Sequence, residues 1–230
     1  MGIMDKPLIV SLGGSLLVPE KIDVEFLKKF RKLVLKHVDQ GRRFLIVVGG
    51  GKTCRIYQDA AREIAKLADE DIDWIGIHVT HLNAQLVRST LREKSHLKVL
   101  THYDKKELID EPVAVAAGWK PGHSTDYDAV MFARLYEADS VINLSDVPFV
   151  YDKDPDKFPD AEPFKNLSWE SYRKMAGERW DPGKHLPFDP IAAKAAQEYG
   201  LKVIIMNGHD LENFENYLTG QKFAGTIISL

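Results

Sequence analysis

The sequence has 230 residues, of which 44% are hydrophobic and 28% charged, and its formal net charge at pH 7 is −3. These values describe an ordinary globular protein with enough residues for a full core, and the slight acidic excess disfavours a general nucleic-acid-binding protein. The single cysteine, Cys54, excludes an intramolecular disulfide and a cysteine-rich metal site. Because we find neither a signal peptide nor an apolar run of ~18 residues, we expect a cytoplasmic protein.

Short apolar runs alternate with segments of helical periodicity. Residues 8–12 and 44–48 are predicted strands, because each is a short apolar run that stops at a glycine cluster. In the predicted helix 189–200, Asp189 is the N-cap and Pro190 the first helical residue. The other predicted helices are 26–38, 56–67, 79–91 and 128–136, and the other strands are 113–117, 140–144, 203–206 and 225–229. This alternation predicts a mostly parallel sheet with helices on both faces.

The longest irregular stretch is residues 152–166, which hold three prolines and four aspartates. A solvated stretch of this length in an α/β protein is often a lid or a ligand-binding edge. An ordinary surface excursion is the alternative, and composition alone leaves both open.

Two glycine clusters each follow a predicted strand and precede a predicted helix: Gly13-Gly14-Ser15 and Gly49-Gly50-Gly51. Glycine lets the backbone approach phosphate oxygens, and the helix N-terminus offers free N–H groups. Neither cluster has the spacing GxxxxGK[ST] or GxGxxG. A single junction of this kind is more often a tight turn, but two in one short chain favour a phosphate site.

The second cluster is followed by Lys52 and Arg55 on the first turn of the predicted helix. Positions i and i+3 lie on one side of a helix, so both cations can face the same anion. Cations oppose the helix dipole at this end, which is easier to understand if an anion binds between them. The alternative is two solvated surface cations.

Two further polar segments are candidates for a site. Residues 121–126 (Pro-Gly-His-Ser-Thr-Asp) supply hydroxyls, an imidazole and a carboxylate before a helix, although Ser124, Thr125 or Asp126 could simply cap that helix. Residues 146–155 place an aromatic side chain beside carboxylates, which suits a purine and its ribose, or form a plain turn. No HExxH or CxxC spacing occurs, so a zinc site is not predicted.

Taken in order, these segments resemble the amino-acid kinase superfamily, and within it the UMP kinases of the archaeal type. The likeness covers nearly the whole chain. Its motifs are Gly13-Gly14-Ser15, Gly49 to Arg55, Asp73 to Ile77, Asn83-Ala84, Pro121 to Asp126, Tyr151 with Asp154-Pro155, and Asp189-Pro190 with Ala192-Ala193-Lys194.

The resemblance implies a three-layer αβα sandwich with a mostly parallel central sheet, in one domain over residues 1–230. Residues 1–135 would bind the acceptor and residues 136–230 the donor. It further implies a cytoplasmic homohexamer that uses ATP with Mg²⁺ as phosphoryl donor and UMP as acceptor.

The resemblance also implies roles for individual residues. ATP would be bound by Gly13, Gly14, Ser15, Gly51, Arg55, Ser145, Asp146, Tyr151 and Asp154. UMP would be bound by Gly50, Asp73, Trp119, Lys120, Pro121, Gly122, His123, Ser124 and Thr125. Lys52, Arg55 and Asp126 are the candidate catalytic residues, since phosphoryl transfer needs positioning and charge neutralisation rather than a covalent nucleophile. No side chain is predicted to ligate the metal directly.

The chain departs from the family pattern at several positions. Many members have a lysine where Ser11 stands, and the usual Asp-Gly of the adenosine edge is Pro148-Phe149. Residues 178–182 resemble an insertion before a turn at 183–187. Lys52 or Lys184 could replace the missing cation, and we favour Lys52, because packing holds a residue on the first turn of a helix.

The sequence leaves two alternative functions open. The first is a kinase of the same fold with another acceptor, such as a carbamate, an acylated amino acid or an isoprenoid phosphate. The isoprenoid members usually place a histidine just after the second glycine cluster, where this chain has Lys52 to Arg55. The second is a nucleotide- or oxyanion-binding protein without turnover, resembling molybdenum storage proteins, which Ser11 motivates.

Overall fold

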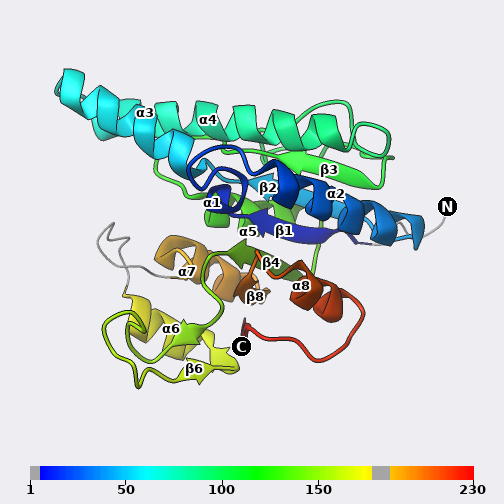
Figure 1. The fold of residues 1–230 in the computed structure, drawn as a ribbon, viewed down its shortest axis with the longest axis vertical. Helices are drawn as coiled ribbons and strands as arrows, with labels where there is room; N and C mark the ends of the chain where they lie inside the picture. Colours follow the sequence, from blue (N-terminus) through cyan, green and yellow to red (C-terminus); the bar gives the residue numbers. More distant parts are fainter. Residues whose placement is uncertain (1–5, 178–186) are drawn as a thin grey trace.

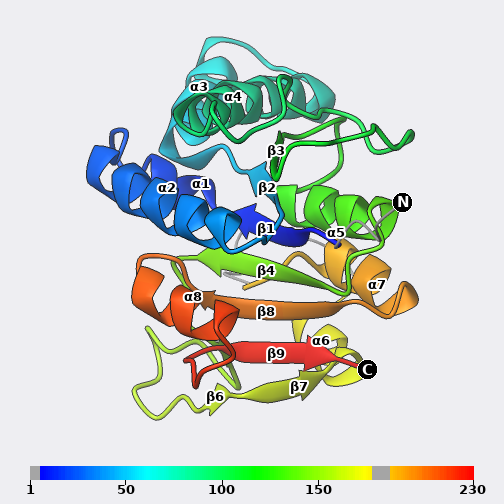
Figure 2. The same cartoon turned by 90° about the vertical axis from the view of Figure 1, so that its right-hand side faces the viewer.

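A computed structural model describes residues 6–177 and 187–230, which form a seven-stranded sheet with helices on both faces (Figures 1 and 2). The strands are β1 Leu8–Leu12, β2 Phe44–Val48, β3 Val113–Ala116, β4 Ser140–Ser145, β5 Val150–Tyr151, β6 Pro163–Phe164, β7 Asn166–Ser168, β8 Lys202–Asn207 and β9 Thr226–Ser229. The helices are α1 Gly14–Leu17, α2 Val24–Asp39, α3 Gly51–Ile64, α4 Asp69–Thr90, α5 Thr125–Leu135, α6 Trp169–Ala176, α7 Pro190–Glu198 and α8 Leu211–Leu218.

The strand order in the main sheet is β3-β2-β1-β4-β8-β9-β7, while β5 and β6 form a separate antiparallel ribbon. The first five strands in this order are parallel, and β9 runs antiparallel to β8. Parallel strands end at the same edge of a sheet. The loops after β1, β2, β3, β4 and β8 therefore emerge together, and this edge is where ligands bind in open α/β sheets.

The sheet separates two hydrophobic cores. Successive residues of a strand point to opposite faces, so Val10 and Leu12 of β1 belong to the core under α2 and α8, whereas Ile9 belongs to the core under α5 and α7. Figure 2 shows these two helical layers on either side of the sheet. The predicted three-layer αβα sandwich with a mostly parallel central sheet is confirmed.

The predicted strands and long helices are present, with differences at their ends. The helix predicted at 128–136 begins at Thr125, because the Ser124 hydroxyl accepts a bond from Tyr127 N and caps it. The helix expected over 56–67 starts at Gly51 and stops at Ile64. The short elements α1, α6, α8 and β5 to β7 were not predicted, since runs of two to eight residues carry too little periodicity.

In residues 6–177 and 187–230, no helix combines the length and the apolar character needed to cross a bilayer.

Candidate active site

The loops that follow β1, β2, β3 and β4 enclose a cleft of about 350 Å³, here called the glycine cleft. The loop between β3 and α5, residues 117–124, is called the acceptor loop. The residues lining the glycine cleft are Ser11, Gly13, Gly14, Ser15, Gly49, Gly50, Gly51, Arg55, Ser124, Thr125, Asp126, Asn143, Ser145, Asp146, Val147 and Pro187. The start of α3 and the start of α5 both lie in this wall, so free backbone N–H groups are available to an anion.

The two glycine clusters touch each other. A Cβ atom added to Gly14 would lie 2.0 Å from Gly51 N and 2.6 Å from Gly49 C, and one added to Gly51 would lie 2.2 Å from Gly14 O. Gly51 also has φ +65°, a conformation that residues with a side chain rarely adopt. The structure thus brings the two predicted junctions into one site, and the part of its wall that they form is bare backbone.

A side chain of α4 braces the second cluster. Asn83, which is buried, donates from Nδ2 to Gly49 O at 2.9 Å and to Gly50 O at 3.0 Å. Gly49 N in turn donates to Leu12 O at 3.0 Å. These bonds fix the backbone before any ligand arrives, which is the arrangement that favours anion binding by amides.

Of the two predicted cations on the first turn of α3, only one stands at the cleft. Arg55 is exposed and lines it. Lys52 is not a lining residue, and its Nζ atom lies 3.6 Å from Glu20 Oε1. Lys184, the other predicted replacement for the missing lysine, lies outside the described residues.

Asp126, on the first turn of α5, accepts three hydrogen bonds. Its Oδ1 atom accepts from Asn143 Nδ2 at 2.7 Å and from Ser11 Oγ at 3.2 Å, and its Oδ2 atom accepts from Asp189 N at 3.3 Å. Ser11 and Asn143 are partners in the β1–β4 register, so two adjacent strands present polar side chains to one carboxyl group. The Ser124 hydroxyl donates to Asp189 and ties this corner to the acceptor loop.

This corner is acidic. Burial raises the pKa of Asp126 to about 7, and the neighbouring Asp189 carboxylate adds to the rise, while the three hydrogen bonds oppose it. The structure therefore favours the protonated form of the Asp126 carboxyl group more than water does. A cation entering the cleft would favour its charged form.

A second cavity, of about 380 Å³, adjoins the glycine cleft, and Val147 and Pro187 line both. We call it the donor cavity because Tyr151 and Asp154, two predicted ATP-binding residues, lie in its wall. Aromatic and apolar side chains line most of the rest, from Phe149, Tyr172 and Met175. Such a wall suits a flat ring, with carboxylates available to hydroxyl groups.

The acceptor loop is anchored to α4. Gly118 N donates to Thr80 Oγ1 at 3.0 Å, and His81 Nε2 lies 2.7 Å from Gly118 O. Further along, Gly122 N donates to Asp73 Oδ2 at 2.8 Å. Asp73, predicted to bind the acceptor, therefore also fixes the loop, and its other carboxyl oxygen has no hydrogen-bond partner among the described residues.

Contacts between aromatic rings also hold the acceptor loop in place. The Trp119 ring packs edge-on against Tyr103 with centroids 4.6 Å apart, and Lys120 Nζ lies 4.5 Å from the Trp119 ring centroid. The His123 ring stacks on Tyr127 at 4.2 Å. The loop is thus a packed element rather than a free excursion.

The predicted site residues fall into three groups. Those that line the glycine cleft are Gly13, Gly14, Ser15, Gly50, Gly51, Arg55, Ser124, Thr125, Asp126, Ser145 and Asp146. Tyr151 and Asp154 line the donor cavity, and Trp119 to His123 form the acceptor loop with Asp73 as its anchor. Lys52 alone is not brought to either cavity or to this loop.

Sequence reasoning missed several residues of the site. Asn143 is a polar side chain inside a buried strand, and that oddity was the available signal. Asp189 was assigned only to its helix cap, although it also borders Asp126. His209, whose Nε2 atom lies 3.2 Å from Asp146 Oδ1, gave no signal, because it approaches from the loop after β8.

Comparison with known proteins agrees with this geometry. The chain matches the amino acid kinase family over residues 6–207. It is 32% identical to the uridylate kinase of Methanobrevibacter smithii and 33% identical to that of Thermococcus kodakarensis, in each case over 96% of this chain and at least 98% of the relative.

A solved structure, the uridylate kinase of Archaeoglobus fulgidus, superposes with a TM-score of 0.82 at 32% identity, over 97% of this chain and 100% of that one. The family match spans more than half of the chain, and the sequence relatives and the structural match agree with it. The chain therefore belongs to the amino acid kinase family.

Proposed function

We propose that this protein is a uridylate kinase, which transfers the γ-phosphoryl group of ATP to UMP and releases ADP and UDP. The observation that carries the proposal is the placement of the glycine cleft between the donor cavity and the acceptor loop. Two substrates bound on either side would meet over bare backbone amides. The kinase names of full-length relatives support the same reaction.

The division of labour follows from this layout. The backbone of Gly13 to Ser15 and of Gly51 would hold the ATP phosphates. Ser145 and Asp146 would contact the ribose of ATP. Tyr151 would contact the adenine in the donor cavity. UMP would lie under the acceptor loop, with Asp73 toward its ribose. The chain would thus use residues 1–135 mainly for UMP and 136–230 mainly for ATP. Phosphoryl transfer then needs only in-line placement and neutralised charge.

Positive charge in the cleft would come from Arg55. Asp126 accepts hydrogen bonds from the hydroxyl and amide of Ser11 and Asn143 rather than from a lysine. In our proposal Asp126 orders this corner and Arg55 stabilises the transferring group. Lys52 would contribute only after leaving Glu20, and an exposed ion pair of that kind is weak enough to break.

We propose that ATP acts as its Mg²⁺ complex. The described residues contain no cluster of three histidine, cysteine, aspartate or glutamate side chains that would bind a metal on its own. The cleft does offer hard oxygen acceptors: the Asp126 carboxyl group and Asn143 Oδ1, which is buried and has no partner among the described residues. These suit a hydrated magnesium ion carried by the phosphates, which they would hold through its water molecules. The ion would supply neutralisation of phosphate charge.

We also propose a cytoplasmic homo-oligomer, for which the resemblance implies six copies. Helix α3 has no buried residue, and Ile56, Tyr57 and Ile64 are 52%, 62% and 84% exposed. Figure 1 shows α3 extending along α4 beyond the sheet. An apolar stripe of this kind fits a second copy of the same helix. Analytical ultracentrifugation of the wild type and Ile64→Glu tests this, since only the variant should dissociate.

A non-catalytic nucleotide-binding protein is the second candidate, and the absence of a lysine among the described residues lining the cleft favours it. One assay separates the two. ADP release from ATP and magnesium is measured with UMP, CMP, AMP and N-acetylglutamate as acceptors. Turnover well above background with UMP supports the kinase, whereas ATP binding without turnover of any acceptor supports the alternative. Turnover with a different acceptor alone contradicts the assignment to UMP.

A further inference from the structure

Asp128 is a buried carboxyl group that the reaction proposed above does not use. It lies two residues after Asp126 on α5, is 2% exposed, and has one oxygen, Oδ1, without a hydrogen-bond partner among the described residues. Aspartate is rarely buried so completely, because removing a carboxyl group from water is costly. The residues around Asp128 indicate which part of the molecule its carboxyl group holds in place.

The carboxyl group faces the start of the acceptor loop. A Cβ atom added to Gly118 would lie 3.6 Å from Asp128 Oδ2, so the group lies against the backbone where the loop leaves β3. The Trp119 backbone amide and the Tyr103 hydroxyl lie close enough to lower its pKa, although neither makes a hydrogen bond of full geometry to it. Tyr103 Oη, like Asp128 Oδ1, does not reach full hydrogen-bond geometry with a partner.

Burial of this carboxyl group raises its pKa to about 8 and so disfavours its charged form. The other titratable groups that face it are Tyr103, Tyr127 and Asp126, none of which is a cation. The group is therefore buried against the backbone of the acceptor loop without a cation among the described groups that act on it.

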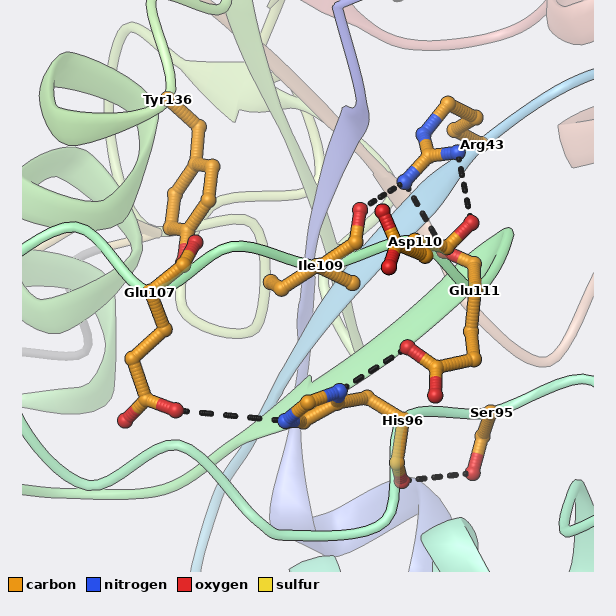
Figure 3. Close-up of polar contacts among 8 residues, drawn as sticks. All are labelled: Arg43, Ser95, His96, Glu107, Ile109, Asp110, Glu111 and Tyr136. Atoms are coloured by element: carbon orange, nitrogen blue, oxygen red, sulfur yellow. Dashed lines mark hydrogen bonds and ion pairs between the residues drawn. The ribbon is translucent and has the colours of Figure 1, made fainter.

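Tyr103 belongs to the chain between α4 and β3, residues 91–112, here called the connector. Figure 3 shows how its far end is fixed: Arg43 donates to three connector carbonyl groups, including that of Glu111 at 2.9 Å. His96 Nδ1 lies 2.9 Å from Glu111 Oε2. The connector is therefore a firm support, and Asp128 lies where it meets α5 and the acceptor loop.

We propose that Asp128 is a positioning residue for the acceptor: lodged between α5, the connector and the acceptor loop, it sets the path of Gly118 and Trp119 and so the shape of the site that receives UMP. This inference rests on the uridylate kinase function proposed above. Asp128 touches no reacting atom and acts through the loop. UMP binding should therefore depend on it, whereas ATP binding in the donor cavity should not.

The test compares three variants of the full chain. Asp128→Ala removes the carboxyl group, Asp128→Asn keeps a neutral hydrogen-bonding group of the same shape, and Val130→Ala makes a cavity in the same helix at a fully buried residue. For each, KM for UMP, KM for ATP and kcat are measured, with UMP affinity by calorimetry and Tm by scanning. We expect Asp128→Ala to raise KM for UMP about tenfold at nearly constant KM for ATP, the size expected when one buried polar contact with the loop is lost.

The controls make the outcomes decisive. Asp128→Asn should stay within about twofold of the wild type, and Val130→Ala should lower Tm while KM for UMP stays constant. Equal rises in KM for UMP in Asp128→Ala and Val130→Ala, or equal rises for both substrates, would overturn the inference. If Asp128→Ala fails to fold, Tyr103→Phe replaces it, and an unchanged KM for UMP there would count against the inference. Wild-type protein that binds no UMP refutes the proposed function instead.

Discussion

The acceptor loop and the donor edge, residues 152–157 in the wall of the donor cavity, are held differently. The acceptor loop is fixed by partners far away in sequence, such as Thr80 for Gly118. The donor edge relies mainly on neighbours: Asp154 accepts from Asp156 N at 3.0 Å and pairs with Lys157 at 3.0 Å. The acceptor loop is thus shaped by tertiary packing and the donor edge by local turns, although Asp146 and Val150, nearer the sheet, also have distant partners in His209 and Thr226.

This difference has a consequence for function. A site built from tertiary contacts can be altered by substitutions in remote helices, whereas a site built from local turns responds mainly to its own residues. Acceptor recognition should therefore be sensitive to changes in α4 and α5. ATP recognition should be tolerant of changes outside the donor cavity.

The largest loss of stability should come from a substitution where the two glycine clusters touch, between the donor and acceptor sides. Gly14→Ala would place a Cβ atom 2.0 Å from Gly51 N, a backbone atom that cannot give way. We expect a loss of stability of more than about 4 kcal/mol, enough to prevent soluble expression or lower Tm sharply. Gly41→Ala is the matched control for strain alone, because a Cβ there meets nothing within 4 Å although φ is +89°. A soluble, active Gly14→Ala protein would show that the clusters do not need this contact.

The next effect concerns charge rather than shape. Arg55 is the cation that lines the glycine cleft among the described residues. If it stabilises the transferring phosphoryl group, Arg55→Ala should lower kcat/KM by on the order of 10²-fold or more with little change in Tm. Arg62→Ala, on the exposed surface of the same helix, is the control. Equal activities would leave Arg55 as a surface cation and weaken the kinase proposal.

A third effect, on stability, comes from Asp126. Its pKa is about 7 when folded against an ordinary value of 3.8, so the folded protein binds the proton more tightly than the unfolded chain. The free energy of unfolding should therefore fall as pH rises from about 4 to 7 and level off above that, as far as this group is concerned. Asp126→Asn removes the titration, so its Tm relative to wild type should be higher at pH 8 than at pH 5, by about 5 °C or more. A Tm difference independent of pH would show that Asp126 is ionised throughout.

The sequence predicted the parts of this molecule that depend on local patterns. Strands such as 44–48 are apolar runs bounded by glycine, and the Asp189-Pro190 helix start has a strong capping signal, so both were found. The glycine clusters were recognised for the same reason. Asp73 was assigned to the acceptor from resemblance alone, and its bond to Gly122 depends on a contact across 49 residues that no local pattern contains.

Side-chain direction was harder to predict than element type. Lys52 and Arg55 have the right spacing to face one anion, but Lys52 pairs with Glu20 and does not line the cleft. The meeting of Ser11 and Asn143 at Asp126 depends on the β1–β4 register, which the sequence does not specify. The role of Asp126 itself remains a prediction that the variants above test.

The smallest effects test the comparison of the two sides directly. Thr80→Val keeps the shape of a residue in α4 but removes the acceptor of the Gly118 N–H bond. Losing one buried hydrogen bond should raise KM for UMP roughly five- to tenfold and leave KM for ATP unchanged. Lys157→Ala removes the exposed partner of Asp154 on the donor edge, and an exposed pair of this kind should change KM for ATP by less than about twofold. Steady-state kinetics with each substrate varied at saturation of the other measures both. Lys157→Ala could instead change KM for ATP more than Thr80→Val changes KM for UMP. That result would reverse the comparison, because local ion pairs would then shape the donor site more strongly than packing shapes the acceptor site.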